Sequence, residues 1–123
     1  MGDKAAPNST TRVPATGLRV VDDAVELARD IHAAVRTIRG HRDLVDQLTR
    51  ATESSALNLA EGAGRNGRDK NYHYNIAYGS AGEASTAISL LGAYGELQPD
   101  TANDFIRRFD RLRAISWRLN HSR

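Results

Sequence analysis

The sequence predicts an all-α protein folded as an antiparallel up-down-up-down four-helix bundle. Four successive segments repeat apolar residues at a spacing of three and four, which is typical of one helix face. Short turn-forming stretches separate them, and helices joined by short loops pack as antiparallel neighbours. No segment alternates apolar and polar residues as a strand would. The chain has 123 residues, the size of one domain, and we expect the bundle over residues 18–123 after a disordered tail at 1–17.

The first predicted helix follows the tail. Its apolar face comprises Leu18, Val21, Val25, Ala28, Ile31, Val35 and Ile38. Asp22 and Asp23 fall in the first turn, and Arg36 and Arg39 in the last turn, where their charges complement the helix dipole. Gly40 provides a C-terminal stop.

The second predicted helix has Asp43 as its N-cap and ends at the glycines from Gly62 onward. Its apolar face comprises Leu44, Leu48, Ala51, Ser55 and Leu59. The second half, 54–60, is rich in small residues, which let two helix backbones approach closely. We therefore expect this half to face another helix.

The third predicted helix begins at an N-cap, Asp69, and ends at Gly95. Its predicted stripe comprises Tyr72, Ile76, Gly79, Glu83, Thr86, Leu90 and Ala93. Internal glycine costs about 1 kcal/mol relative to alanine, so Gly79 and Gly82 require a packing reason, and we expect close contact with the small half of the second helix. The tyrosines of this segment cannot all share one stripe, so some should be exposed.

The fourth predicted helix opens at Pro99, because proline is tolerated in the first turn, where no backbone donor is needed. It has the clearest stripe of the four. The stripe comprises Ala102, Phe105, Ile106, Phe109, Leu112, Ile115 and Leu119, with Trp117 nearby.

Basic residues form two clusters, although the net charge is only +2. The first cluster is Arg65, Arg68 and Lys70, and the second is Arg107, Arg108, Arg111, Arg113, Arg118 and Arg123. Local charge density of this kind is compatible with phosphate binding. It is equally typical of a solvated or ion-paired face, and acidic residues such as Asp104 and Asp110 dilute the second cluster.

Motifs for catalysis and cofactor binding receive little support. The chain has no cysteine, which excludes disulfides and thiolate metal sites. The run 62–67 spells G-x-G-x-x-G, but it follows a helix and not a strand, so it does not predict a dinucleotide site. No histidine has a glutamate three residues before it, as a di-metal bundle requires.

The serines are explained by helix packing, with their hydroxyls bonded back to the backbone. Glu61 is expected to pair with Arg65, four residues on. We predict no catalytic residue, no metal and no cofactor. No apolar run is long enough for a membrane span or a secretory leader, so we expect a cytoplasmic protein.

Two stretches carry a family resemblance. The sequence NLAEGAGR at 58–65 and the sequence AYGSAGE at 77–83 resemble, in this order, motifs of the small bacterial four-helix-bundle proteins of intervening sequences in large-subunit ribosomal RNA genes. The resemblance covers the chain from about Val21 onward. Residues that match the two motifs are Asn58, Glu61, Arg65, Gly79, Ser80 and Glu83, which the resemblance implies form a packing and assembly constellation.

The resemblance also implies an assembly. Members of this family, and related accessory proteins of diversity-generating retroelements, form ring-like homopentamers, and the latter bind nucleic acid and a reverse transcriptase. Two hypotheses follow. The chain is a non-enzymatic homo-oligomeric adaptor that binds RNA or DNA, or a nucleic-acid enzyme, through an arginine-bearing face. Alternatively, it is a structural or protein-binding oligomer with no nucleic-acid role.

Overall fold

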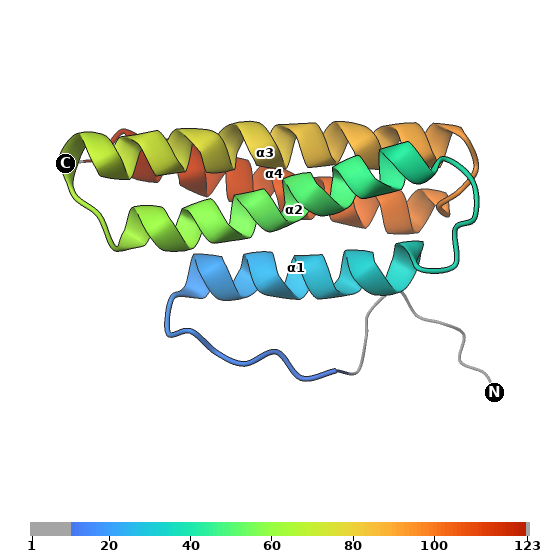
Figure 1. The fold of residues 1–123 in the computed structure, drawn as a ribbon, viewed down its shortest axis with the longest axis horizontal. Coiled ribbons are helices and arrows are strands. Elements are labelled where there is room, and N and C mark those ends of the chain that lie inside the picture. The colour runs from blue at the N-terminus through green and yellow to red at the C-terminus, as the bar shows by residue number, and fades with distance from the viewer. Residues whose placement is uncertain (1–10, 123) are drawn as a thin grey trace.

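Residues 11–122, which the computed structural model describes, form a bundle of four helices (Figure 1). The helices are α1 (Arg19–Val35), α2 (Arg42–Ala63), α3 (Gly67–Ala93) and α4 (Pro99–Asn120). Short connections at alternate ends reverse the chain direction after each helix. No strand occurs within residues 11–122. The predicted all-α four-helix bundle is therefore confirmed.

Helices α2 and α4 bury the faces that their apolar spacing predicts. Leu48 and Leu59 of α2, and Phe105 and Phe109 of α4, are fully buried in one continuous core. Such large side chains contribute roughly 1.5–3 kcal/mol each on burial. Trp117 is an exception, since its ring is 51% exposed on the outside of α4.

Helix α3 turns a different face to the core from the one predicted. Tyr72 is 61% exposed and Leu90 is also exposed, so the predicted stripe is wrong. The buried residues are Tyr74, Ala77, Ala81, Ala84, Ala87, Ile88 and Leu91. Alanine carries little apolar signal in a sequence, so the periodicity favours the face that carries Tyr72, Ile76 and Leu90. Its small side chain nevertheless allows close packing, and α3 packs extensively against both α2 and α4.

The expected reason for the two internal glycines is also wrong. A Cβ added at Gly79 would meet nothing within 4 Å, and Gly79 is exposed. A Cβ at Gly82 would lie 3.2 Å from Nε of Arg113, a residue of α4 and not of α2. The small half of α2 does face α3, through contacts such as the hydrogen bond between Ser54 and Ser80.

Three helix ends differ from the predicted caps. Helix α1 ends at Val35, so the predicted last-turn residues Arg36 and Arg39 lie in the connection that follows. Helix α2 is preceded by His41 in a left-handed conformation, with φ of 55°, and Asp43 lies in its first turn. Helix α3 begins at Gly67, so Asp69 is also a first-turn residue. Aspartate favours both cap and first-turn positions, which the sequence does not distinguish.

The segment before α1 is held by hydrogen bonds. The backbone N–H and the hydroxyl of Thr16 donate to Oδ1 of Asp22, at 2.8 and 2.7 Å. These two bonds lower the pKa of Asp22, and the bond from the backbone N–H has the larger effect. The predicted disorder of residues 1–10 lies outside the described residues. None of the described helices is both long and apolar enough to cross a membrane.

Candidate functional site

Arg108, a residue of the second predicted basic cluster, forms an ion pair between two helices of the bundle. Its Nη1 lies 2.8 Å from Oδ2 of Asp30, a carboxylate on α1 that is only 2% exposed. The same nitrogen is 3.5 Å from Oδ2 of Asp104. A buried carboxylate requires a charged partner, because desolvation otherwise strongly disfavours it. Arg108 supplies that partner, which makes it a link between α1 and α4.

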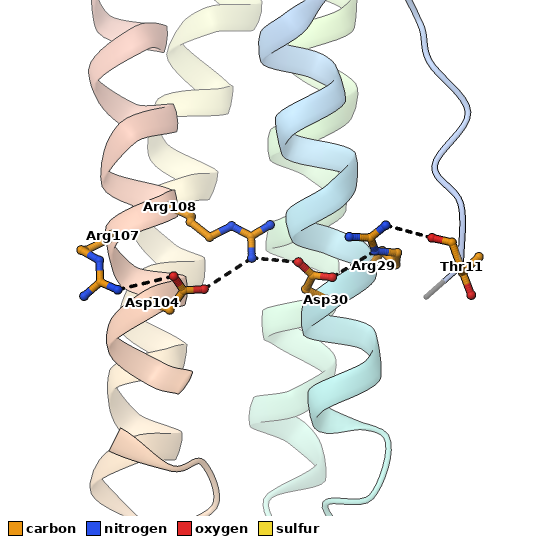
Figure 2. Close-up of polar contacts among 6 residues, drawn as sticks. All are labelled: Thr11, Arg29, Asp30, Asp104, Arg107 and Arg108. Carbon is orange, nitrogen blue, oxygen red and sulfur yellow. Dashed lines mark hydrogen bonds and ion pairs between the residues drawn. The ribbon is translucent and has the colours of Figure 1, made fainter. Parts of the chain in front are cut away.

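The ion pair belongs to a longer chain of contacts (Figure 2). Nε of Arg29 lies 3.0 Å from Oδ1 of Asp30, and Nη1 of Arg29 donates to the carbonyl oxygen of Thr11 at 2.8 Å. At the other end, Nη2 of Arg107 lies 3.5 Å from Oδ1 of Asp104. The contacts thus run from the segment before α1, across α1, to the outer face of α4. Sequence reasoning missed Asp30, although its position beside Ile31 on a buried helix face is a usable signal.

Two other arginines of α4 remain on the surface. Arg111 and Arg118 are exposed and have no ion pair within residues 11–122. They are seven residues apart, which places them on the same side of the helix about 10.5 Å apart. Trp117 is also exposed but points about 100° away from Arg118 around the helix, and its ring stacks on that of His121 with centroids 3.9 Å apart. We call Arg111 and Arg118 the α4 basic face.

Arg113 has a different role. Its guanidinium carbon lies 4.4 Å from the centroid of the Tyr78 ring, in a cation–π contact between α4 and α3. Nε of Arg113 is buried without a hydrogen-bond partner. This arginine therefore contributes to helix packing. Arg123 lies outside the described residues.

The first predicted basic cluster lies around the connection between α2 and α3. Arg65 pairs with Glu61 at 3.0 Å and with Asp69 at 3.2 Å, and these carboxylates raise the pKa of Arg65. The predicted pairing of Glu61 with Arg65 is confirmed. Lys70 donates from Nζ to the carbonyl oxygen of Ser122 at 3.4 Å. Arg68 is exposed and carries no ion pair within the described chain.

The residues of the two family-like stretches lie mostly along the seam between α2 and α3. Asn58 Oδ1 is 2.8 Å from Nδ1 of His73, and the hydroxyls of Ser54 and Ser80 are 2.8 Å apart. Farther along the seam, Nε2 of Gln47 donates to Oε2 of Glu83 at 3.2 Å. Three polar contacts across one pair of helices fix their register. The sequence singled out one member of each pair but did not predict its partner.

The glycines at 62–67 serve the helix ends and the core. Gly62 lies in the last turn of α2, Gly64 is its C-cap and Gly67 begins α3, so no strand precedes the glycines in this part of the described chain, as a dinucleotide-binding unit would require. A Cβ at Gly62 would lie 2.6 Å from Cε1 of Tyr74, and only glycine leaves room for this buried ring. Burial in turn raises the pKa of the Tyr74 phenol.

The histidines and serines of the described residues do not converge on one site. His73 bonds to Asn58, Glu83 bonds to Gln47, and His32 lines a small hollow between α1 and α2. Within residues 11–122 no three His, Cys, Asp or Glu side chains are placed to hold a metal ion. The hydroxyl of Ser55 donates to the carbonyl of Thr52 at 2.7 Å, as expected for a packed serine.

The fold and these contacts define a small helical-bundle protein in which many charged side chains join the helices and others stay on the surface. Sequence comparison identifies the group. The chain belongs to the 23S rRNA-intervening sequence protein family, whose profile matches residues 16–117. A comparison with curated proteins finds no match. The family resemblance noted in the sequence is therefore confirmed.

Proposed function

We propose that this protein is a non-enzymatic, homo-oligomeric adaptor of the bacterial cytoplasm that binds nucleic acid, alone or with a nucleic-acid enzyme such as a reverse transcriptase. The observation that carries the proposal is the α4 basic face. Neither Arg111 nor Arg118 forms an ion pair within the described residues, although Arg111 lines a hollow together with Asp23 and Glu26. Arg118 and, to a smaller extent, Arg111 can therefore contact phosphates.

The other predicted arginines contribute less to this surface. Arg108 is held by Asp30, and Arg65 is held by Glu61 and Asp69. A phosphate would have to displace these carboxylates. Arg68 remains exposed without an ion pair among residues 11–122, and Lys70 is held only by long hydrogen bonds to Ser122. Arg107 stays at the edge of the surface with a long contact to Asp104.

Self-association is the second part of the proposal. Leu57 on α2 is 66% exposed, and Tyr72 on α3 is also exposed. Their neighbours Asn58 and His73 are joined by a hydrogen bond, which brings both apolar side chains to the same end of the α2–α3 pair. Exposed leucine and tyrosine are typical of protein interfaces. The family resemblance implies a ring-like pentamer as the form of this assembly.

The exposure of Leu57 and Tyr72 also favours the alternative function, a structural or protein-binding oligomer without a nucleic-acid role. The exposed side chains of Leu57 and Tyr72 can contact a different protein as well as a second copy of the chain. The two functions differ in the role of α4. The alternative requires nothing of Arg111 and Arg118, whereas the adaptor requires both.

Salt-dependent binding tests the proposal. Nuclease-treated protein is titrated with a labelled structured RNA at several salt concentrations, and the complex mass is followed by light scattering. Duplex binding loses about 0.9 in the slope of log K against log salt for each phosphate contact removed. The pair Arg111→Gln and Arg118→Gln should therefore reduce the slope by about 1.8.

The matched control is Arg65→Gln, because Arg65 is also exposed but is paired with carboxylates. It should change the slope much less than the double variant. An intact oligomer that binds no RNA at low salt would refute the adaptor and support the structural alternative. Equal RNA binding by the wild type and the double variant would show that the RNA does not contact Arg111 and Arg118 of α4.

A further inference from the structure

A third group of arginines surrounds the turn between α1 and α2. Arg36, Arg39 and Arg42, together with Thr37 and Ile38, line a surface hollow of about 700 Å³, which we call the arginine hollow. No carboxylate lines it. Arg36 and Arg39 form no ion pair or hydrogen bond within the described chain. The third, Arg42, donates to the carbonyl oxygen of Ile38 at 3.0 Å, which holds it against the turn.

A second hollow of about 510 Å³ adjoins the first and shares Arg42 with it. Its lining includes His41, Leu90 and Tyr94, and we call it the aromatic hollow. The rings of His41 and Tyr94 stack with centroids 4.7 Å apart and an interplanar angle of 17°. Tyr94 nevertheless remains 54% exposed. A large ring with one stacked neighbour and an open remainder is a natural platform for another flat group.

The backbone holds His41 in this position. Its φ of 55° is left-handed, which is uncommon for a residue other than glycine and costs roughly 1–2 kcal/mol. The His41 ring is also 3.6 Å from Oε2 of Glu96, in the connection between α3 and α4. Two loops at one end of the bundle are thus joined beside the arginines. Strained residues of this kind concentrate at binding surfaces.

The acidic residues nearby determine where an anion can lie. Asp46 is 3.8 Å from Arg42, and Glu96 faces His41, so each has a cationic or titratable neighbour. Asp43 lines the aromatic hollow and repels an anion on that side. The favourable place for a phosphate is consequently the arginine hollow, and the favourable place for an uncharged ring is the aromatic hollow.

We propose that these adjoining hollows form a binding site for single-stranded nucleic acid, with phosphates at Arg36, Arg39 and Arg42 and a base on Tyr94. Proteins commonly bind single strands through basic side chains that contact the phosphates and through neighbouring aromatic rings on which the bases stack. A duplex keeps its bases stacked inside and cannot offer one to the ring. The inference rests on the proposed nucleic-acid role, but it uses the opposite end of the bundle from the C-terminal half of α4 (Figure 1).

The test compares a labelled single-stranded oligonucleotide with its duplex on the full-length protein. Tyr94→Ala should weaken single-strand binding about ten-fold, within the range of one stacked base, and leave duplex binding unchanged. Tyr94→Phe keeps the ring and should bind as the wild type does.

A second variant is independent of the ring. Replacing both Arg36 and Arg39 with Gln should lower the single-strand salt slope by about 1.4, because each contact contributes about 0.7. Unchanged single-strand binding by both variants would overturn the inference. If the Arg111 and Arg118 variant still reduced RNA binding in that case, the proposed function would stand without this site. A wild-type protein that binds neither form of nucleic acid would refute both.

Discussion

Two glycines with opposite surroundings provide a direct test of the packing between α2 and α3. Gly62→Ala places a Cβ 2.6 and 2.7 Å from two ring carbons of Tyr74, whereas ordinary contacts are 3.4–4 Å. Tyr74 is buried, so its ring cannot move aside without displacing the core. Overpacking of this kind costs about 1–3 kcal/mol, and the helix preference of alanine offsets less than about 1 kcal/mol of it in a last turn. We expect a net destabilisation of about 1–2 kcal/mol.

The matched variant is Gly79→Ala, in the interior of α3 with nothing near the added Cβ. It should stabilise the protein by about 1 kcal/mol, through helix propensity alone. Urea unfolding of both variants at one fixed protein concentration measures the difference, since oligomers unfold in a concentration-dependent way. A Gly62→Ala protein as stable as the wild type would refute the packing argument. A Gly79→Ala protein that loses both stability and mass would place a second subunit on the exposed face of α3.

Three further predictions concern ionisable groups. Asp30→Ala leaves Arg108, which is 23% exposed, with only its longer contact to Asp104, and should cost about 1.5–3 kcal/mol in urea unfolding, part of which Arg108→Met restores in the double variant. Hydrogen bonds from Thr16 lower the pKa of Asp22, so their contribution is present above the ordinary aspartate pKa and disappears as pH falls through the lowered one. Amide exchange of the segment before α1 should rise there, and Asp22→Asn should abolish the pH dependence. Burial raises the pKa of Tyr74, so stability should fall as pH rises through that pKa, and Tyr74→Phe should remove this alkaline step.

Each of these predictions has a contradicting result. Additive effects of Asp30→Ala and Arg108→Met in the double-mutant cycle would show that the two side chains do not interact. If amide exchange in the Asp22→Asn variant still rose at low pH, the pH dependence would come from other carboxylates. An ultraviolet titration in which every tyrosine ionises together would contradict the burial of Tyr74.

The predictability of each helix follows the size of its buried side chains. Phe105 and Phe109 repeat at a spacing of four on α4, and their apolar signal exceeds that of their neighbours. On α3 the buried positions include Ala77, Ala81 and Ala84, whose spacing is equally regular but whose side chains differ little from the rest. Sequence periodicity therefore located α3 but assigned the wrong face to the core.

The same reasoning explains what could be predicted of the candidate site. The pairing of Glu61 with Arg65 depends only on a helical spacing of four, so it can be predicted from the sequence alone. The pairing of Asp30 with Arg108 depends on how α1 lies against α4, which no local pattern encodes. For this reason the density of arginine in the sequence overstated the charge that α4 presents to a ligand.

The attachment of α1 connects the internal ion pair with the proposed single-strand site. Helix α1 packs less extensively on its neighbours than α3 does, and Asp30 is its charged link to Arg108 of α4. Arg36 follows Asp30 by less than two helical turns. Loosening α1 should thus displace Arg36 and Arg39 without moving Arg111 on α4.

Asp30→Asn offers a milder perturbation than alanine because it keeps the shape of the side chain. We expect it to weaken binding of a single-stranded oligonucleotide while leaving duplex binding through the α4 basic face unchanged, provided that both are measured where circular dichroism shows a folded protein. Equal loss of both activities would instead mean that Asp30 supports the whole bundle and not the position of the arginine hollow.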